Sequence, residues 1–144
     1  MTPTERALKY SRAQRREFTA SLQEFVRIPS VSSDPRHRAD IDAAARWLAQ
    51  RLRNAGLQQV ELACAGGHPI VYAEQDGPPG SPTVLVYGHY DVQPATPLEE
   101  WRVPPFAAEI VGPDMYGRGT TDDKGQLLCH VNAIEAWLKR SHES

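Results

Sequence analysis

The most informative part of this 144-residue chain reads Val84-Leu85-Val86-Tyr87-Gly88-His89-Tyr90-Asp91-Val92-Gln93-Pro94. Its first residues form a continuous apolar run, which predicts a strand that is covered on both faces, as in an α/β sheet. The histidine and the aspartate follow where that strand would end. Because ligands bind beyond the carboxyl ends of the strands in open α/β sheets, this position favours a functional role for His89.

The residue types around His89 indicate a metal site. A neutral imidazole is a good zinc ligand, and it generally needs a carboxylate on its other ring nitrogen. Asp91 has the alternating spacing that places its carboxylate on the same side as His89. Further along the chain, Asp122 could bind one metal ion or bridge two. Taken singly, each motif has a simpler interpretation, because His89 could be a hydrogen-bonded histidine at a strand end and Asp122 a helix cap.

Small and charged residues surround Asp122. The cluster reads Tyr116-Gly117-Arg118-Gly119-Thr120-Thr121-Asp122-Asp123-Lys124-Gly125. Glycines allow a tight approach of the backbone without obstruction by side chains. We expect Arg118 and Lys124 to offset part of the negative charge.

Hydrophobic periodicity predicts three helices. The first covers residues 18–26 and stops before Pro29. The second runs from Asp40, a candidate N-cap, to Gly56, a C-terminal stop signal. The third covers residues 124–139 and places the acidic pair at its N-terminus.

Short extended segments predict strands at residues 57–62, 70–73 and 83–87. The link over residues 75–82 contains Gly and Pro and is interpreted as a hairpin connection. Residues 91–121 form a long irregular stretch with one short apolar piece at residues 107–111. Ordered loops of this length are usually functional.

Bulk properties favour one soluble domain. The hydrophobic fraction is 40%, and the 12 prolines indicate a loop-rich chain. A net charge of −2 argues against nucleic acid as a partner. No run of 18 apolar residues could span a bilayer, so we expect no membrane association and a cytoplasmic protein. Three arginines form a local basic run that is interpreted as a solvated helix face: Arg12, Arg15 and Arg16.

Other side chains receive structural interpretations. Cys64 and Cys129 lack the spacing of a thiolate zinc site and are expected to be buried small hydrophobes in a reducing compartment, with no disulfide. The apolar loop residues are expected to plug the core or to pack under the acidic loop: Trp101, Pro104, Pro105, Phe106, Met115 and Tyr116. No role is assigned to the remaining histidines: His37, His68, His130 and His142.

Three motifs taken together resemble the metallopeptidase family of carnosinases, aminoacylases, carboxypeptidase G and succinyl-diaminopimelate desuccinylase. They are residues 88–94, Trp101 with Pro104-Pro105-Phe106, and residues 116–126. The Tyr after the histidine, the Gln before the proline, and the Trp with Pro-Pro-Phe are most similar to the carnosinase-like dipeptidase branch.

The resemblance implies hydrolysis of a dipeptide or related amide by water that two zinc ions activate, with Mn or Co as possible replacements. It implies that His89 binds one zinc, that Asp122 bridges both, and that Asp91 orients His89 and counts as catalytic. It also implies a cis peptide bond after Asp122. The fold implied is an α/β three-layer sandwich of the di-zinc exopeptidase type.

The resemblance also implies parts that residues 1–144 do not contain. These are a Glu-Glu pair with the general base, a further acidic ligand, a final histidine ligand, and a lid domain through which the parent enzyme could form a homodimer. We therefore expect residues 1–144 to be the N-terminal part of the catalytic domain, with an incomplete sheet. Since two protein ligands are fewer than zinc sites normally have, the isolated chain should bind metal weakly and turn over negligibly.

Two other functions stay open at this point. The chain could be an inactive protein that keeps the half-site as a binding or regulatory module. A nonmetal α/β binding domain is a third interpretation, but it does not explain why both acidic motifs occur together and in order.

Overall fold

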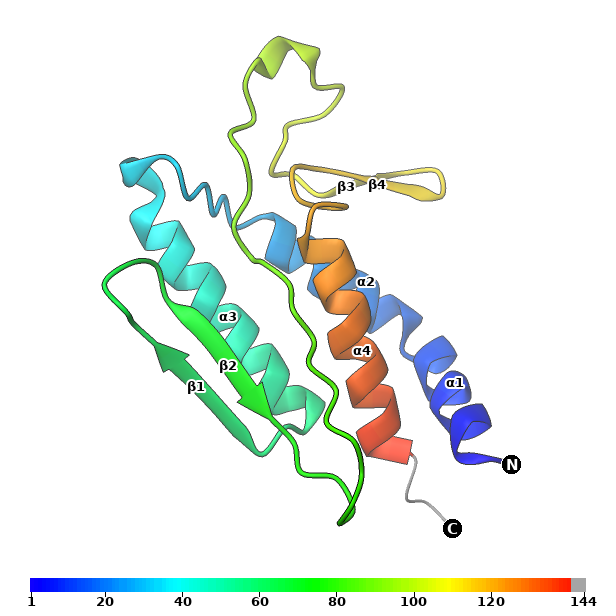
Figure 1. Cartoon of the computed structure of the whole chain (residues 1–144). Coiled ribbons are helices and arrows are strands. Elements are labelled where there is room, and N and C mark those ends of the chain that lie inside the picture. Colours follow the sequence, from blue (N-terminus) through cyan, green and yellow to red (C-terminus); the bar gives the residue numbers. More distant parts are fainter. Residues whose placement is uncertain (141–144) are drawn as a thin grey trace.

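The computed structural model describes residues 1–140, so His142 lies outside the described residues. Helices and strands are both present, and Figure 1 shows how they are arranged. The helices are α1 (Pro3–Ala13), α2 (Arg15–Val26), α3 (Arg38–Ala55) and α4 (Lys124–Arg140), with short 3-10 turns η1 (Pro35–His37) and η2 (Leu98–Glu100). The strands are β1 (Gln59–Ala63), β2 (Ile70–Glu74), β3 (Glu109–Val111) and β4 (Asp114–Tyr116).

The N-terminal helix α1 was not predicted. Thr2 caps it, since its hydroxyl accepts from the backbone of Glu5 while the Glu5 carboxylate accepts from the backbone of Thr2. This reciprocal capping box, with Pro3 in the first turn, was the available sequence signal. Helix α1 packs against α4, where the Tyr10 hydroxyl donates to Glu135 at 2.7 Å. The predicted helix over residues 18–26 is confirmed as the larger part of α2.

The boundaries of α3 confirm one expectation and correct another. Gly56 ends the helix in the left-handed conformation, with φ of 107°, as predicted. Asp40 is not the N-cap, because the helix begins at Arg38 and His37 holds the cap position. The Asp40 carboxylate lies in the first turn and contacts the Nδ1 atom of His37 at 2.7 Å.

The core lies where α2, α3 and α4 meet. Phe25 is fully buried and its ring stacks on Trp47 with centroids 4.5 Å apart. The cluster continues through the apolar stripes of α3 and α4, which the helical periodicity predicted: Ala44, Leu48, Leu52, Ala55, Leu128 and Val131. The hairpin of β1 and β2 covers the other side of α3.

Two of the three predicted strands are confirmed. Strands β1 and β2 pair antiparallel, with Glu61 opposite Tyr72, and β3 and β4 form a second small hairpin within the long irregular stretch. The predicted strand over residues 83–87 does not form within residues 1–140, because that segment is extended but pairs with no described strand. Val84 and Leu85 are 79% and 91% exposed, which contradicts the expected cover on both faces.

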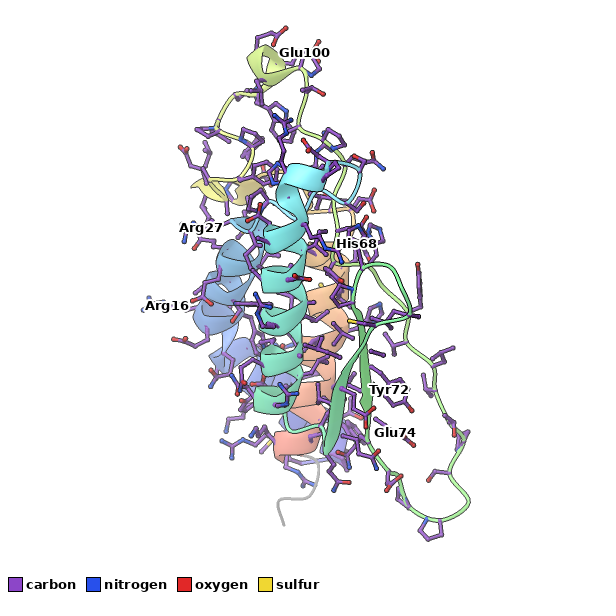
Figure 2. The ribbon with its side chains drawn as sticks, turned by 90° about the vertical axis from the view of Figure 1, so that its left-hand side faces the viewer. Arg16, Arg27, His68, Tyr72, Glu74 and Glu100 are labelled. Carbon is purple, nitrogen blue, oxygen red and sulfur yellow. The ribbon has the colours of Figure 1, made fainter. Side chains whose placement is uncertain are left out.

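The hairpin predicted over residues 75–82 is also absent. Beyond Glu74 the chain leaves the body of the molecule in a wide loop before it returns (Figure 2). In Figure 1 the returning segment runs between the α3 side and α4. An apolar run becomes a buried strand only where partners cover it, and within residues 1–140 none pairs with it.

Several surface expectations can be compared directly. The arginines of the basic run, Arg12, Arg15 and Arg16, are exposed as predicted. Cys64 and Cys129 are free as expected, but both are exposed, so the prediction of burial is wrong. Cys64 lies at the end of β1, and Cys129 lies on the outward side of α4. Within residues 1–140, each helix is too short or too polar to cross a membrane.

Candidate metal centre

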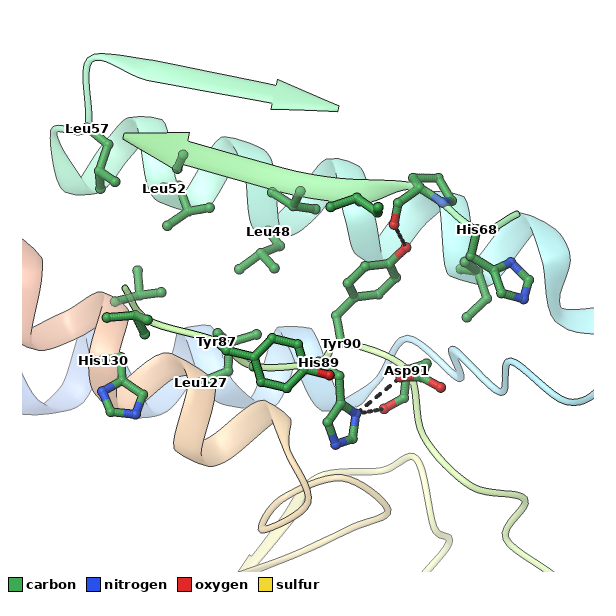
Figure 3. Close-up of a pocket in the computed structure, with 18 of the residues that line it drawn as sticks. Leu48, Leu52, Leu57, His68, Tyr87, His89, Tyr90, Asp91, Leu127 and His130 are labelled. Atoms are coloured by element: carbon green, nitrogen blue, oxygen red, sulfur yellow. Dashed lines mark hydrogen bonds and ion pairs between the residues drawn. The ribbon is translucent and has the colours of Figure 1, made fainter. Parts of the chain in front are cut away.

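His89 lies where the extended segment reaches the N-terminus of α4. Alternation along the segment sends Tyr90 toward β2, where its hydroxyl donates to the carbonyl of Pro69, and sends His89 to the opposite side (Figure 3). Burial, with the nearby Asp91 charge, raises the pKa of Tyr90 to about 12. Tyr90 therefore anchors the segment on one side while the imidazole is presented on the other.

Asp91 contacts the Nδ1 side of the His89 ring. The Nδ1 atom lies 3.1 Å from the Asp91 carboxylate and 3.1 Å from the Asp91 backbone carbonyl (Figure 3). Both partners are acceptors, so the geometry favours a proton on Nδ1, which leaves Nε2 as the nitrogen that could bind a metal ion. This arrangement is typical of a metal-ligating histidine.

Asp122 lies on the other side of the ring. Its Oδ1 atom accepts at 2.9 Å from His89 Nε2, so this contact favours a protonated ring when no metal ion is present. The side chain of Asp122 is 81% exposed and that of His89 is 39% exposed. Two ligands that each lie about 2.0–2.2 Å from one tetrahedral zinc ion are about 3.3–3.6 Å apart. The imidazole nitrogen and the carboxylate oxygen at 2.9 Å therefore have the chemistry of two metal ligands, and they would need to separate by roughly 0.5 Å to share an ion.

The surroundings of His89 also affect its pKa. Burial would lower that pKa, but the hydrogen bond to the Asp91 backbone raises it, as do the Asp122 contact and the charges of Asp91 and Asp123. The net direction is upward. Protons and a metal ion thus compete for the same nitrogen, so metal binding should weaken as the pH falls.

Within residues 1–140, no group of three or more histidine, cysteine, aspartate or glutamate side chains is arranged to hold one metal ion. The two predicted ligands that the structure brings together are His89 and Asp122. The Asp122–Asp123 peptide bond is cis, as the resemblance implied.

Two residues near the site were not predicted. The Ser32 hydroxyl donates to Asp91 Oδ2 at 2.5 Å, and the Asp123 carboxylate accepts from the backbone N–H of His89 at 3.0 Å. Ser32 reaches the site because Val31 forms a parallel bridge with Val92. In the sequence, the serine-rich turn indicated only a loop. No role was predicted for Asp123 that differed from the role of its neighbour Asp122.

The glycines of the acidic turn allow a close approach, as predicted. A Cβ atom on Gly125 would lie 1.9 Å from the carbonyl oxygen of Thr120. Gly119 has φ of 91°, and a Cβ there would lie 2.7 Å from Val92. A larger residue at position 125 would require the backbone to move. At position 119 it would require the Val92 side chain to move and a positive φ that other residues rarely adopt, so the turn depends on both glycines.

The expected roles of Arg118 and Lys124 need correction. The Arg118 guanidinium lies over the ring of Trp101 at 5.0 Å from its centroid. Lys124 is fully buried, and its Nζ atom donates to the carbonyls of Phe25 at 2.9 Å and Ile28 at 2.7 Å. Neither cation contacts the acidic pair directly. Burial lowers the pKa of Lys124 to about 7, although the charge of Asp91 acts in the opposite direction.

The loop that carries Trp101 is partly buried, but its aromatic side chains are not among those that pack against the hydrophobic core, so the plug interpretation is not confirmed. The Trp101 indole N–H donates to the carbonyl of Ala95 at 2.9 Å. Phe106, Met115 and Tyr116 are also half-buried.

A cavity of about 570 Å³ adjoins the site on the side that Tyr90 faces (Figure 3). His89 and Asp91 lie at its border, and apolar side chains of β2, α3 and α4 form most of its wall. His68 and His130, to which no role was assigned, also line it.

Comparison with known proteins identifies the relatives of this chain. The family described as Peptidase family M20/M25/M40 matches residues 85–144. The chain is 37% identical over 141 residues to the Cys-Gly metallodipeptidase DUG1 of Candida albicans, covering 88% of this chain and 29% of that protein. It is 35% identical over 145 residues to the Beta-Ala-His dipeptidase of Mus musculus, covering 92% of this chain and 30% of that one.

Solved structures agree with these relatives. The structure of the di-peptidase Dug1p from Saccharomyces cerevisiae superposes with a TM-score of 0.87 at 29% identity, over 99% of this chain and 33% of that chain. The structure of human carnosine dipeptidase 1 superposes with a TM-score of 0.86 at 32% identity, over 94% of this chain and 32% of that chain. The present chain thus spans about a third of the length of the proteins it matches, and its similarity is to Peptidase family M20/M25/M40.

Proposed function

We propose that this chain supplies the first half of the metal site of a dipeptidase that uses two zinc ions. The single observation that carries the proposal is the His89 ring, held between Asp91 on Nδ1 and Asp122 on Nε2. Relatives named as Cys-Gly and Beta-Ala-His dipeptidases support a dipeptide or small amide as substrate.

In this proposal His89 and Asp122 would hold the metal, with Asp122 as the ligand common to both ions. Bound zinc would supply a Lewis acid for the scissile carbonyl and for water. Manganese or cobalt could occupy the same nitrogen- and oxygen-donor site.

The other residues act on the ligands. Asp91 holds the proton on Nδ1, which leaves Nε2, on the side of Asp122, as the nitrogen that would bind the metal ion. Ser32 binds the second oxygen of Asp91 and so prevents that carboxylate from turning away. The ring is therefore oriented before any ion arrives, which lowers the ordering cost of binding.

We further propose that residues 1–144 form the N-terminal part of a three-layer catalytic domain. In it, the unpaired segment 83–87 is a strand of a larger sheet, and a dimer forms through a lid domain outside these residues. The TM-score with Dug1p supports this placement. The alternative of a binding or regulatory module is not favoured, because the relatives are dipeptidases.

Two experiments test the function. Titration of residues 1–144 with ZnCl₂, followed through the imidazole ¹⁵N signals, should show weak binding at His89 that His89→Ala and Asp122→Ala each abolish. His130→Ala is the matched control, because His130 is an exposed histidine on α4.

The product of the complete gene should hydrolyse Cys-Gly or β-alanyl-histidine and lose that activity with His89→Ala. A variant that keeps both its zinc content and its hydrolysis would contradict the site. An Asp122→Ala variant with unchanged zinc affinity would contradict the bridging role.

A further inference from the structure

The segment that carries His89 has few backbone hydrogen bonds. No described residue accepts from the backbone N–H groups of Leu85 or Tyr87, and the segment pairs with no strand. At its end, the N–H of His89 donates to the Asp123 carboxylate at 3.0 Å. The side chain of Asp123 thus takes the place that the carbonyl of a neighbouring strand would normally hold.

The approach of Asp123 to this segment depends on Gly88. A Cβ atom on Gly88 would lie 3.0 Å from Asp123 Oδ2 and 2.8 Å from Leu127. Glycine is therefore needed for the backbone before His89 to lie directly against the start of α4. The close fit on two sides indicates a fixed contact.

Asp122 and Asp123 act on the same residue from different directions. Asp122 reaches the Nε2 atom of the His89 ring, while Asp123 holds the His89 backbone. The position of the ring relative to the Asp122 carboxylate is therefore set by the Asp123 contact. The buried Lys124 that follows ties the same turn to the end of α2.

We propose that Asp123 is a positioning residue, which sets the distance between His89 and Asp122 by accepting the His89 backbone hydrogen bond. The inference rests on the proposed function, because that distance matters only if both side chains bind metal. Asp123 itself contacts no metal in this proposal. Changes to partners that orient metal ligands typically cost about 10- to 100-fold in affinity.

The first test requires no metal and no variant. In residues 1–144, the His89 amide should exchange with D₂O at least about tenfold more slowly than the Leu85 and Tyr87 amides, after correction for intrinsic rates. Equal protection would overturn the proposal. This measurement stays informative if zinc fails to bind, in which case the proposed function fails separately.

The second test uses matched variants and the zinc titration above. Asp123→Ala should weaken zinc binding by about tenfold and release the His89 amide, whereas Asp123→Asn, which keeps an acceptor oxygen, should stay within about threefold of wild type. Asp114→Ala removes an equal charge from the exposed β3–β4 hairpin and should change nothing.

An Asp123→Ala variant that binds zinc as wild type does would overturn the proposal. Equal losses in Asp123→Asn and Asp123→Ala would also overturn it, because they would assign the effect to charge. If Asp123→Ala does not fold, Asp123→Asn and the exchange rates of the wild-type chain decide the question.

Discussion

Residues 84–87 and residues 88–92 belong to one extended segment, yet their surroundings differ sharply. Val84 and Leu85 lie almost fully in solvent, with no backbone partner among the described residues. A few residues later, Val92 is 3% exposed and its N–H donates to the Ser30 carbonyl at 2.9 Å. His89 lies between these halves and is held from both its backbone and its ring.

The difference shows that order at the candidate site does not depend on a complete sheet. Contacts of Asp91, Asp123 and Ser32 fix the second half through side chains. The first half has apolar side chains suited to a sheet but lacks such contacts. The half-site can therefore be preorganised within residues 1–140 while the neighbouring apolar run is not.

The largest effect on the ordered half of the segment is expected when Asp91, the partner of the His89 ring, is changed. Asp91→Asn should preserve the fold and lower zinc affinity by about 10- to 100-fold, because Nδ1 loses a charged acceptor that fixes its tautomer. The measurement is zinc titration followed by ¹⁵N signals, with thermal unfolding as the check on folding. The exposed Asp76→Asn is the control. Unchanged affinity would remove the orienting role of Asp91.

A pH series tests the anchoring of the acidic turn. Since the pKa of Lys124 is about 7 when folded and 10.5 in an ordinary lysine, the unfolded chain holds a proton between these values that the folded chain lacks. The free energy of unfolding should therefore rise by about 2 kcal/mol from pH 7 to pH 9.

Urea unfolding at several pH values measures this slope, and Lys124→Met should remove it. Lys139→Met, at an exposed position of α4, should leave it unchanged. A slope that persists in Lys124→Met would assign the effect to another group.

A smaller effect is expected at Ser32. Ser32→Ala removes the hydroxyl that holds Asp91 and should weaken zinc binding several-fold, equivalent to about 1 kcal/mol. The neighbouring exposed residue provides the control variant, Ser33→Ala. Equal zinc affinities in the two variants would show that Asp91 needs no second partner.

The smallest effect is expected in the unpaired half. Leu85→Ser replaces a side chain that is 91% exposed, so the free energy of unfolding of residues 1–144 should change by less than about 0.5 kcal/mol. Leu128→Ala, in the core, should cost about 2–5 kcal/mol in the same urea experiment. A large loss with Leu85→Ser would mean that the segment is buried in solution.

Local sequence patterns were sufficient to predict much of the fold. The apolar stripe of α3 and its stop at Gly56 follow from helical spacing and from the left-handed conformation that glycine allows. Helix α4 was equally clear. Helix α1 was missed because its sequence is polar, and its capping box was the sole local signal. The apolar run from Val84 predicted a strand covered on both faces, which the described residues do not form. Hydrophobicity indicates that a segment needs cover, but it does not supply the partner.

The spacing of His89, Asp91 and Asp122 along the chain was enough to propose a metal site and its chemistry, because residue type and alternation decide which atoms can ligate. Only the folded chain revealed that Asp123 holds the His89 backbone, that Ser32 holds Asp91, and that Lys124 is buried against the end of α2. These contacts join residues that are between 34 and 99 positions apart in the chain. No local pattern encodes such pairs, since they form only when packing of the helices brings distant segments together.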